Sequence, residues 1–237
     1  MRSGRQPALG GEVSTLLLFD IDHTLLWTGG AGRRALESAF LEVLGVRNGL
    51  DGVPVSGRTD PAILRDMLRQ HGLSDGRKTL ERLLESYLRH LERFLPLVRG
   101  RVMPGIPELL TALRGREGVR MGLATGNVRR GAQLKLAHYR LDGYFSDGAF
   151  GDEAEDRPSL VALAIRRLGG EERPRRVLVI GDTPLDVQAA KACDAIAVAV
   201  ATGEYSQEEL LRAGADLVFP DLSDWRGALV RLLGEAP

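Results

Sequence analysis

The chain has 237 residues, 43% of them apolar, which is enough for one large core or for a core domain with a smaller insert. With 32 basic and 32 acidic residues the formal net charge is zero, so composition gives a nucleic-acid partner no electrostatic support. A single cysteine excludes an intramolecular disulfide, and no apolar stretch approaches the roughly 18 residues of a membrane span. We therefore expect a soluble, cytoplasmic protein with neither a nucleic-acid nor a membrane partner.

Taken in chain order, the first 13 residues are rich in Gly, Pro and Arg and are expected to form a flexible tail. Short apolar runs then predict strands, because each is followed by small or acidic residues and by a stretch with helical spacing. These runs cover 15–19, 119–124, 177–180 and 196–200, with a weaker candidate at 217–219. Strands buried on both faces that alternate with helices predict an α/β fold, a Rossmann-like, doubly wound parallel sheet.

One segment breaks this alternation, since only helical patterns are found between about 28 and 102. Helices are expected over 31–44, 61–71 and 80–94, with Asp60 as the N-cap of the second and Pro61 at its first position. We expect these helices to pack as a small inserted domain over 29–102. The α/β core would then consist of residues 14–28 and 103–237.

The pattern Asp20-Ile21-Asp22-His23-Thr24 directly follows the first expected strand. A carboxylate at a strand end can accept a phosphoryl group and later release it, which makes Asp20 a candidate nucleophile. Asp22, on the turn beyond, can protonate a leaving oxygen and then take a proton from an attacking water. The alternative is an acidic turn without chemistry.

Two further acidic residues, Asp182 and Asp186, follow the strand expected at 177–180. Carboxylates gathered around Asp20 would repel one another, and Mg²⁺ would remove that strain because it prefers oxygen ligands and bridges to phosphate. Asp182 is the stronger candidate ligand. Asp186 has an alternative role, which is to cap the helix that begins at Pro184.

Thr125, Gly126 and Asn127 follow the strand expected at 119–124 and lead into a helix. A hydroxyl group and free backbone N–H groups at such a position form a cradle for phosphate oxygens. The same three residues are also typical of an ordinary N-capping turn.

These three groups, in this order and spacing, resemble the haloacid dehalogenase superfamily of hydrolases, over about 15–225. The resemblance implies that Asp20 is the nucleophile and Asp22 the general acid/base. Asp20 and Asp22 match the family's first motif, Thr125 its second, and Asp182 with Asp186 its fourth. The resemblance also implies that magnesium is held by Asp20, by the backbone carbonyl of Asp22 and by the aspartates of the fourth motif. The helical insert resembles the family's C1 cap, and the chain looks most like the phosphoglycolate-phosphatase-like branch. Arg58, in the cap, either reaches an anionic substrate group or is a solvated surface arginine.

The third motif departs from the family pattern, in which a lysine, often followed by Pro, precedes the fourth-motif strand. Here Arg157 stands before Pro158. Arg157 could balance phosphate charge, although arginine and lysine are not equivalent. The alternative is Lys135, one of three lysines, which could reach the site from the helix that follows Thr125.

The resemblance implies Mg²⁺-dependent hydrolysis of a small, phosphoglycolate-like phosphate monoester through an aspartyl-phosphate on Asp20. The partner would be a small phosphorylated metabolite, and the protein a monomer or a homodimer. The nearest alternative is a phosphomutase of the beta-phosphoglucomutase type. A halide-releasing dehalogenase would need neither Asp22 nor the metal cluster, and a receiver-type signalling domain would be about half this length. A non-catalytic phosphate-sensing or regulatory protein is a more remote alternative.

Overall fold

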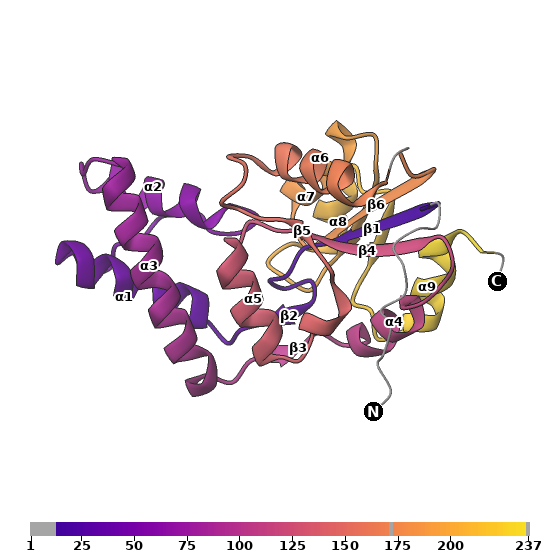
Figure 1. Cartoon of the computed structure of the whole chain (residues 1–237), viewed down its shortest axis with the longest axis horizontal. Helices are drawn as coiled ribbons and strands as arrows, with labels where there is room; N and C mark the ends of the chain where they lie inside the picture. The colour runs from indigo at the N-terminus through magenta and orange to yellow at the C-terminus, as the bar shows by residue number, and fades with distance from the viewer. Residues whose placement is uncertain (1–12, 171–172, 236–237) are drawn as a thin grey trace, which may run out of the picture.

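The computed structural model describes residues 13–170 and 173–235. Residues 1–12 of the expected tail lie outside the described residues, and Val13, its last residue, is buried. Figure 1 shows two parts, an α/β part built on a twisted sheet and a group of helices at the opposite end of the molecule. Within the described residues, no helix combines the length and the apolar character that crossing a bilayer requires.

The sheet has six strands in the order β5-β4-β1-β6-β7-β8, and all neighbours are parallel. The strands are β1 (Thr15–Phe19), β4 (Val119–Ala124), β5 (Gly148–Ala149), β6 (Arg176–Gly181), β7 (Ile196–Val200) and β8 (Leu217–Phe219). The expected doubly wound parallel sheet is therefore confirmed. Among these six strands, only the two-residue edge strand β5 was not expected.

Alternate residues of each strand face opposite layers of helices, as the two-residue period of a strand requires. Leu17 and Phe19 pack in one cluster and Leu16 and Leu18 in another. The first layer contains α4 (Ile106–Leu113), α5 (Arg129–His138) and α9 (Trp225–Leu233). The second contains α6 (Arg157–Leu168), α7 (Pro184–Ala192) and α8 (Gln207–Arg212).

The three remaining α-helices are α1 (Ala31–Leu44), α2 (Asp60–Gln70) and α3 (Arg77–Phe94). They share an apolar cluster of their own, apart from the two clusters that flank the sheet. The antiparallel pair β2 (Leu26–Trp27) and β3 (Arg101–Val102) joins the chain where it enters and leaves this segment. Two short 3-10 helices complete the structure, η1 (Leu95–Leu97) and η2 (Asp142–Tyr144). The division into core and cap domains stays a prediction.

The N-cap expected at the start of α2 is wrong by one residue. Thr59 has the extended backbone of an N-cap, and its hydroxyl oxygen accepts a hydrogen bond from the Ala62 amide at 3.2 Å. Asp60 is instead the first helical residue. Its carboxylate is therefore not needed to cap its own helix.

Candidate functional site

The carboxyl ends of three neighbouring strands bring the expected residues to one edge of the sheet. Phe19 of β1 is in register with Leu123 of β4 and with Ile180 of β6. The residues that follow these positions therefore emerge side by side. In this way Asp20, the loop that begins at Thr125, and Asp182 lie around a common space.

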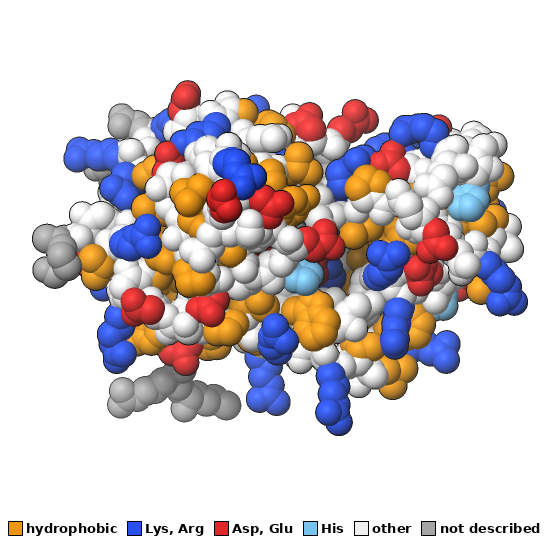
Figure 2. Space-filling view, turned by 180° about the vertical axis from the view of Figure 1, so that it is seen from behind, with side chains coloured by type: hydrophobic (Ala, Val, Ile, Leu, Met, Phe, Trp, Pro, Cys, Tyr) orange, Lys and Arg blue, Asp and Glu red, His pale blue; other side chains and the backbone are white. Residues whose placement is uncertain are grey.

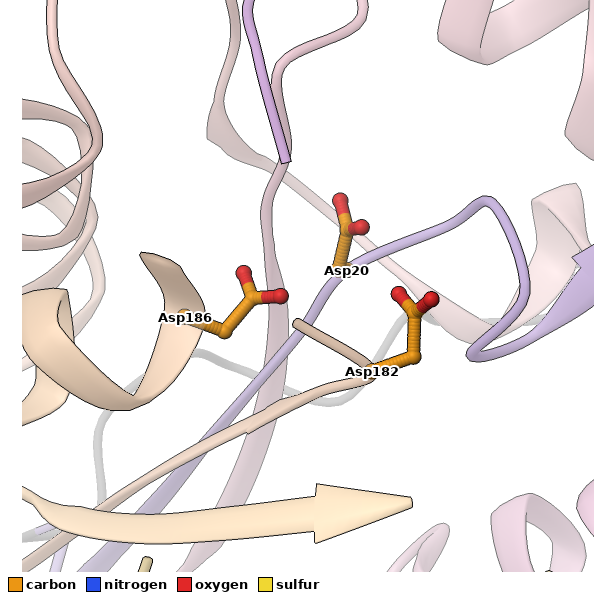
Figure 3. Close-up of side chains that lie close together, drawn as sticks. All are labelled: Asp20, Asp182 and Asp186. Atoms are coloured by element: carbon orange, nitrogen blue, oxygen red, sulfur yellow. The ribbon is translucent and has the colours of Figure 1, made fainter. Parts of the chain in front are cut away.

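Asp20, Asp182 and Asp186 form a compact cluster of carboxylates (Figure 3). One oxygen from each lies within 4.8 Å of the others. Asp20 follows β1, Asp182 follows β6, and Asp186 lies in the first turn of α7, where Pro184 occupies the first helical position. All three are buried, with exposures of 7%, 4% and 2%.

The three carboxylates differ in their partners. Asp186 accepts hydrogen bonds from the amide (3.1 Å) and hydroxyl (2.7 Å) of Thr183, which closes the capping box of α7. Its other oxygen accepts from Arg157. Asp182, in contrast, has no cationic partner among the described side chains. Asp186 therefore takes part in capping α7 and also belongs to the cluster, while its role as a metal ligand stays a prediction.

The cluster fits a hard, oxygen-seeking divalent cation. Burial raises the pKa of Asp182 well above its usual range, and the charges of Asp186 and Asp20 add to this rise. Burial likewise raises the pKa of Asp20, against the opposing charge of Arg157. A divalent cation would relieve this excess of negative charge with the carboxylate ligands that such ions prefer. A Cβ at Gly203 would overlap the Asp182 carboxylate, so glycine leaves this side of the cluster free.

Arg157 lies beside the candidate nucleophile. It begins α6 and is only 6% exposed. Its Nη1 is 3.3 Å from Asp20 Oδ1, and its Nη2 donates to Asp186. Burial alone would lower the pKa of Arg157, but the charges of Asp186 and Asp20 outweigh it and raise that pKa, so the guanidinium stays charged.

Lys135 faces the other candidate catalytic carboxylate. It extends from α5, is 3% exposed, and donates from Nζ to Asp22 Oδ2 at 2.6 Å and to Asn127 Oδ1 at 2.5 Å. Burial alone would raise the pKa of Asp22, but the Lys135 charge and the hydrogen bonds from Lys135 and Asn127 lower it. Both cations considered from the sequence are thus in the site, each paired with a different carboxylate.

The loop after β4 is held by its own side chains. Thr125 is fully buried, and its Oγ1 accepts from the Asn127 amide at 3.3 Å and from Asn127 Nδ2 at 3.0 Å. Asn127 Nδ2 also donates to Asp22 Oδ2 at 2.8 Å. Gly126 is tightly enclosed, because a Cβ there would overlap the carbonyl oxygen of Arg58. Asn127 therefore links the loop to Asp22, a contact that the local sequence does not reveal.

A cavity of about 380 Å³ opens between the cluster and the three-helix segment. Figure 2 shows charged side chains of both signs around the hollow between the two parts of the molecule. Arg58 lines this cavity, and its Nη2 also pairs with Asp66 on α2 at 2.5 Å. The expected contact of Arg58 with a substrate stays a prediction, but its position at the cavity wall is compatible with it.

The cavity is also lined by Asp60, Tyr87 and Glu204, for which the sequence predicted no role there. Tyr87 follows the apolar spacing of its helix and so looks like an ordinary core residue. Glu204 hydrogen-bonds to Ser56, 148 positions away in the sequence, at 2.7 Å. For Asp60 the sequence did hold a signal, because Thr59 directly before it is also a favoured N-cap residue and leaves the Asp60 carboxylate free for another contact.

Comparisons with known proteins agree with this geometry. Residues 15–194 match the family model described as haloacid dehalogenase-like hydrolase. A phosphoglycolate phosphatase of Synechococcus elongatus is 30% identical over 169 residues, which cover 71% of this chain and 76% of that protein. The crystal structure of a hydrolase from Pseudomonas syringae is 26% identical with a TM-score of 0.69, covering 92% of this chain and 98% of that one. A candidate beta-phosphoglucomutase from Thermotoga maritima has the same fold, with 23% identity, a TM-score of 0.61 and coverage of 92% and 99%.

Proposed function

Because this chain belongs to the haloacid dehalogenase-like hydrolases and is a phosphatase, we propose that it hydrolyses a small, phosphoglycolate-like phosphate monoester through a phosphorylated Asp20, with Mg²⁺ as cofactor. The observation that carries this proposal is the meeting of Asp20, Asp182 and Asp186 at the sheet edge, with Arg157 beside Asp20. If Asp20 is the nucleophile, the guanidinium of Arg157 supplies positive charge that can offset its approach to an anionic phosphate.

In the first step, a carboxylate oxygen of Asp20 forms a bond to phosphorus while the ester P–O bond breaks. Asp22 gives its proton to the departing alkoxide, so that an alcohol leaves. In the second step a water attacks the phosphorus of phosphorylated Asp20, Asp22 takes the water's proton, and phosphate is released with Asp20 restored. Lys135 and Asn127 favour the ionised form of Asp22, which the second step needs, and they disfavour the protonated form, which the first step needs.

Asp20, Asp182 and the backbone carbonyl of Asp22 would hold Mg²⁺, with Asp186 completing the cluster. Bound there, the ion would neutralise charge on the transferring phosphate and on the carboxylates around it. Arg157 keeps its charge at any ordinary pH and holds Asp20 and Asp186 at fixed positions. Thr125, Gly126 and Asn127 would line the phosphate-binding side, with Lys135 behind them.

The helical segment 29–102 would act as a cap that shields the phosphorylated intermediate from bulk water. Its apolar side chains Leu36, Val55 and Ile63 line the cavity together with Arg58. The cavity of about 380 Å³ is suited to a small metabolite. Three further expectations stay predictions: location in the cytoplasm, the absence of a nucleic-acid partner, and a monomeric or homodimeric state.

Phosphate release from p-nitrophenyl phosphate and from phosphoglycolate, with Mg²⁺ and with a chelator, tests the proposal. We expect release to require the metal and to fall at least roughly 1,000-fold in Asp20→Asn, because the nucleophile is lost. Asp75→Asn, an identical change at an exposed site on a loop far from the cluster, is the matched control. Full activity of Asp20→Asn would remove the mechanism. Incubation with a sugar monophosphate would show an isomer, not free phosphate, if the phosphomutase alternative were correct.

A further inference from the structure

Asp60 is a buried carboxylate that the proposed reaction does not use. It is 7% exposed at the start of α2, and within the described residues no lysine or arginine forms an ion pair with it. Burial raises its pKa from 3.8 to about 6, although the charge of Lys135 opposes this rise. A buried carboxylate without a paired cation is destabilising. Its presence at the cavity therefore indicates a role other than stability.

Two hydrogen bonds join Asp60 to the loop that follows β4. Its main-chain N–H donates to the Gly126 carbonyl at 2.8 Å. Its Oδ2 accepts from the Val128 amide at 2.9 Å. These bonds hold the loop on both sides of Asn127, the residue whose side chain contacts both Asp22 and Lys135.

The rest of the segment before α2 is also packed closely against the sheet edge. A Cβ at Gly126 would overlap the Arg58 carbonyl oxygen, and a Cβ at Gly57 would lie 2.7 Å from Thr183 Oγ1. The loops after β4 and β6 are thus both in contact with this short segment. The hydrogen bonds of Asp60 exist only while the helical segment and the sheet edge lie together in this way.

We propose that Asp60 is a positioning residue, which fixes Asn127, and through it Lys135 and Asp22, when the helical segment covers the site. The inference rests on the proposed function. Without the acceptor, the buried Val128 N–H has no partner and the loop can shift. A displacement of about 1 Å in a catalytic group can lower turnover on the order of 100-fold.

The first test compares Asp60→Ala, Asp60→Asn and the control Asp75→Asn, using p-nitrophenyl phosphate with Mg²⁺. We expect kcat to fall about 10- to 100-fold in Asp60→Ala, because the loop that carries Asn127 shifts and Asn127 no longer holds Asp22 and Lys135 in place. Asp60→Asn should recover most of this loss, since its amide oxygen can still accept from Val128. An unchanged kcat in Asp60→Ala, or equal losses in the alanine and asparagine variants, would overturn the proposal.

The second test needs no activity, because hydrogen exchange of the Val128 amide reports its bond to Asp60 directly. Exchange should be faster in Asp60→Ala than in the unmodified protein, and unchanged in Asp75→Asn and Asp20→Asn. Equal exchange in the unmodified protein and Asp60→Ala would refute the positioning role. An active Asp20→Asn variant would refute the proposed function but not the role of Asp60. Hydrogen exchange of the Val128 amide would still decide that role.

Discussion

Replacing Asp60 by asparagine should make the protein more stable at pH 8. Burial raises the pKa of Asp60 from 3.8 to about 6, so its ionised form is disfavoured in the folded state. At about 1.4 kcal/mol for each pKa unit, ionised Asp60 lowers the free energy of unfolding by about 3 kcal/mol. Asparagine has nearly the same shape and carries no charge, so Asp60→Asn should recover up to that amount.

The direction of the pH dependence follows from the same shift. Between about pH 4 and pH 6 the folded protein holds a proton on Asp60 that the unfolded chain has released. The contribution of Asp60 to stability is therefore fully present below pH 3.8 and is lost as the pH rises through about 6. The stability difference between Asp60→Asn and the unmodified protein should be largest at pH 8 and should vanish near pH 4.

Urea unfolding at several pH values, with the two proteins measured side by side, provides the assay. Titrating groups distant from Asp60 contribute equally to both proteins and largely cancel in the difference, whereas Asp22, whose charge raises the pKa of Asp60, does not cancel fully. The control Asp75→Asn should differ from the unmodified protein by less than about 0.5 kcal/mol at every pH. A variant Asp60→Asn that is no more stable at pH 8, or whose advantage does not decrease toward pH 4, would refute the reasoning.

Four further changes test the site itself. Asp182→Asn should weaken activation by Mg²⁺ at least about tenfold in a metal titration, because it removes a charged ligand; unchanged activation would exclude Asp182 as a ligand. Gly203→Ala should lower kcat at least about tenfold, because its Cβ would overlap the Asp182 carboxylate, whereas Gly76→Ala, with 3.6 Å to the nearest atom, should not. Arg157→Lys keeps the charge but cannot contact Asp20 and Asp186 together, so kcat should fall about tenfold. Full activity of this variant would show that the double contact is not needed. Lys135→Met should lower kcat about 100-fold with little effect on KM, and an unaffected kcat would separate Lys135 from the chemistry.

Much of the fold was predictable because its signals are local. Leu16 to Phe19 are all apolar and are followed by an acidic turn, a pattern typical of a strand buried on both faces. The parallel arrangement then requires the residues after each strand to meet at one edge, which is why Asp20 and Asp182 could be placed together. The edge strand β5 has only two residues, and such a short segment leaves no periodic signal.

The partners of the cations were not predictable, because they depend on how helices pack against the sheet edge. The sequence left Lys135 and Arg157 as alternatives for one role, yet each contacts a different carboxylate across more than 100 positions of the chain. The same reason hid Asp60, whose bond to Val128 joins residues 68 positions apart. Local spacing identified the residue types, and tertiary packing decided what each one touches.

The pairing of each cation with its own carboxylate has a consequence for the chemistry. Arg157 opposes the rise that burial causes in the pKa of Asp20, while Lys135 and Asn127 stabilise the ionised form of Asp22. When the carboxylates of Asp20, Asp22, Asp182 and Asp186 are all ionised, Arg157 and Lys135 balance only two of their four charges, and one divalent ion would balance the other two. Because Arg157 and Lys135 are already bonded to protein carboxylates, we expect the metal, more than either side chain, to bring in the phosphate dianion.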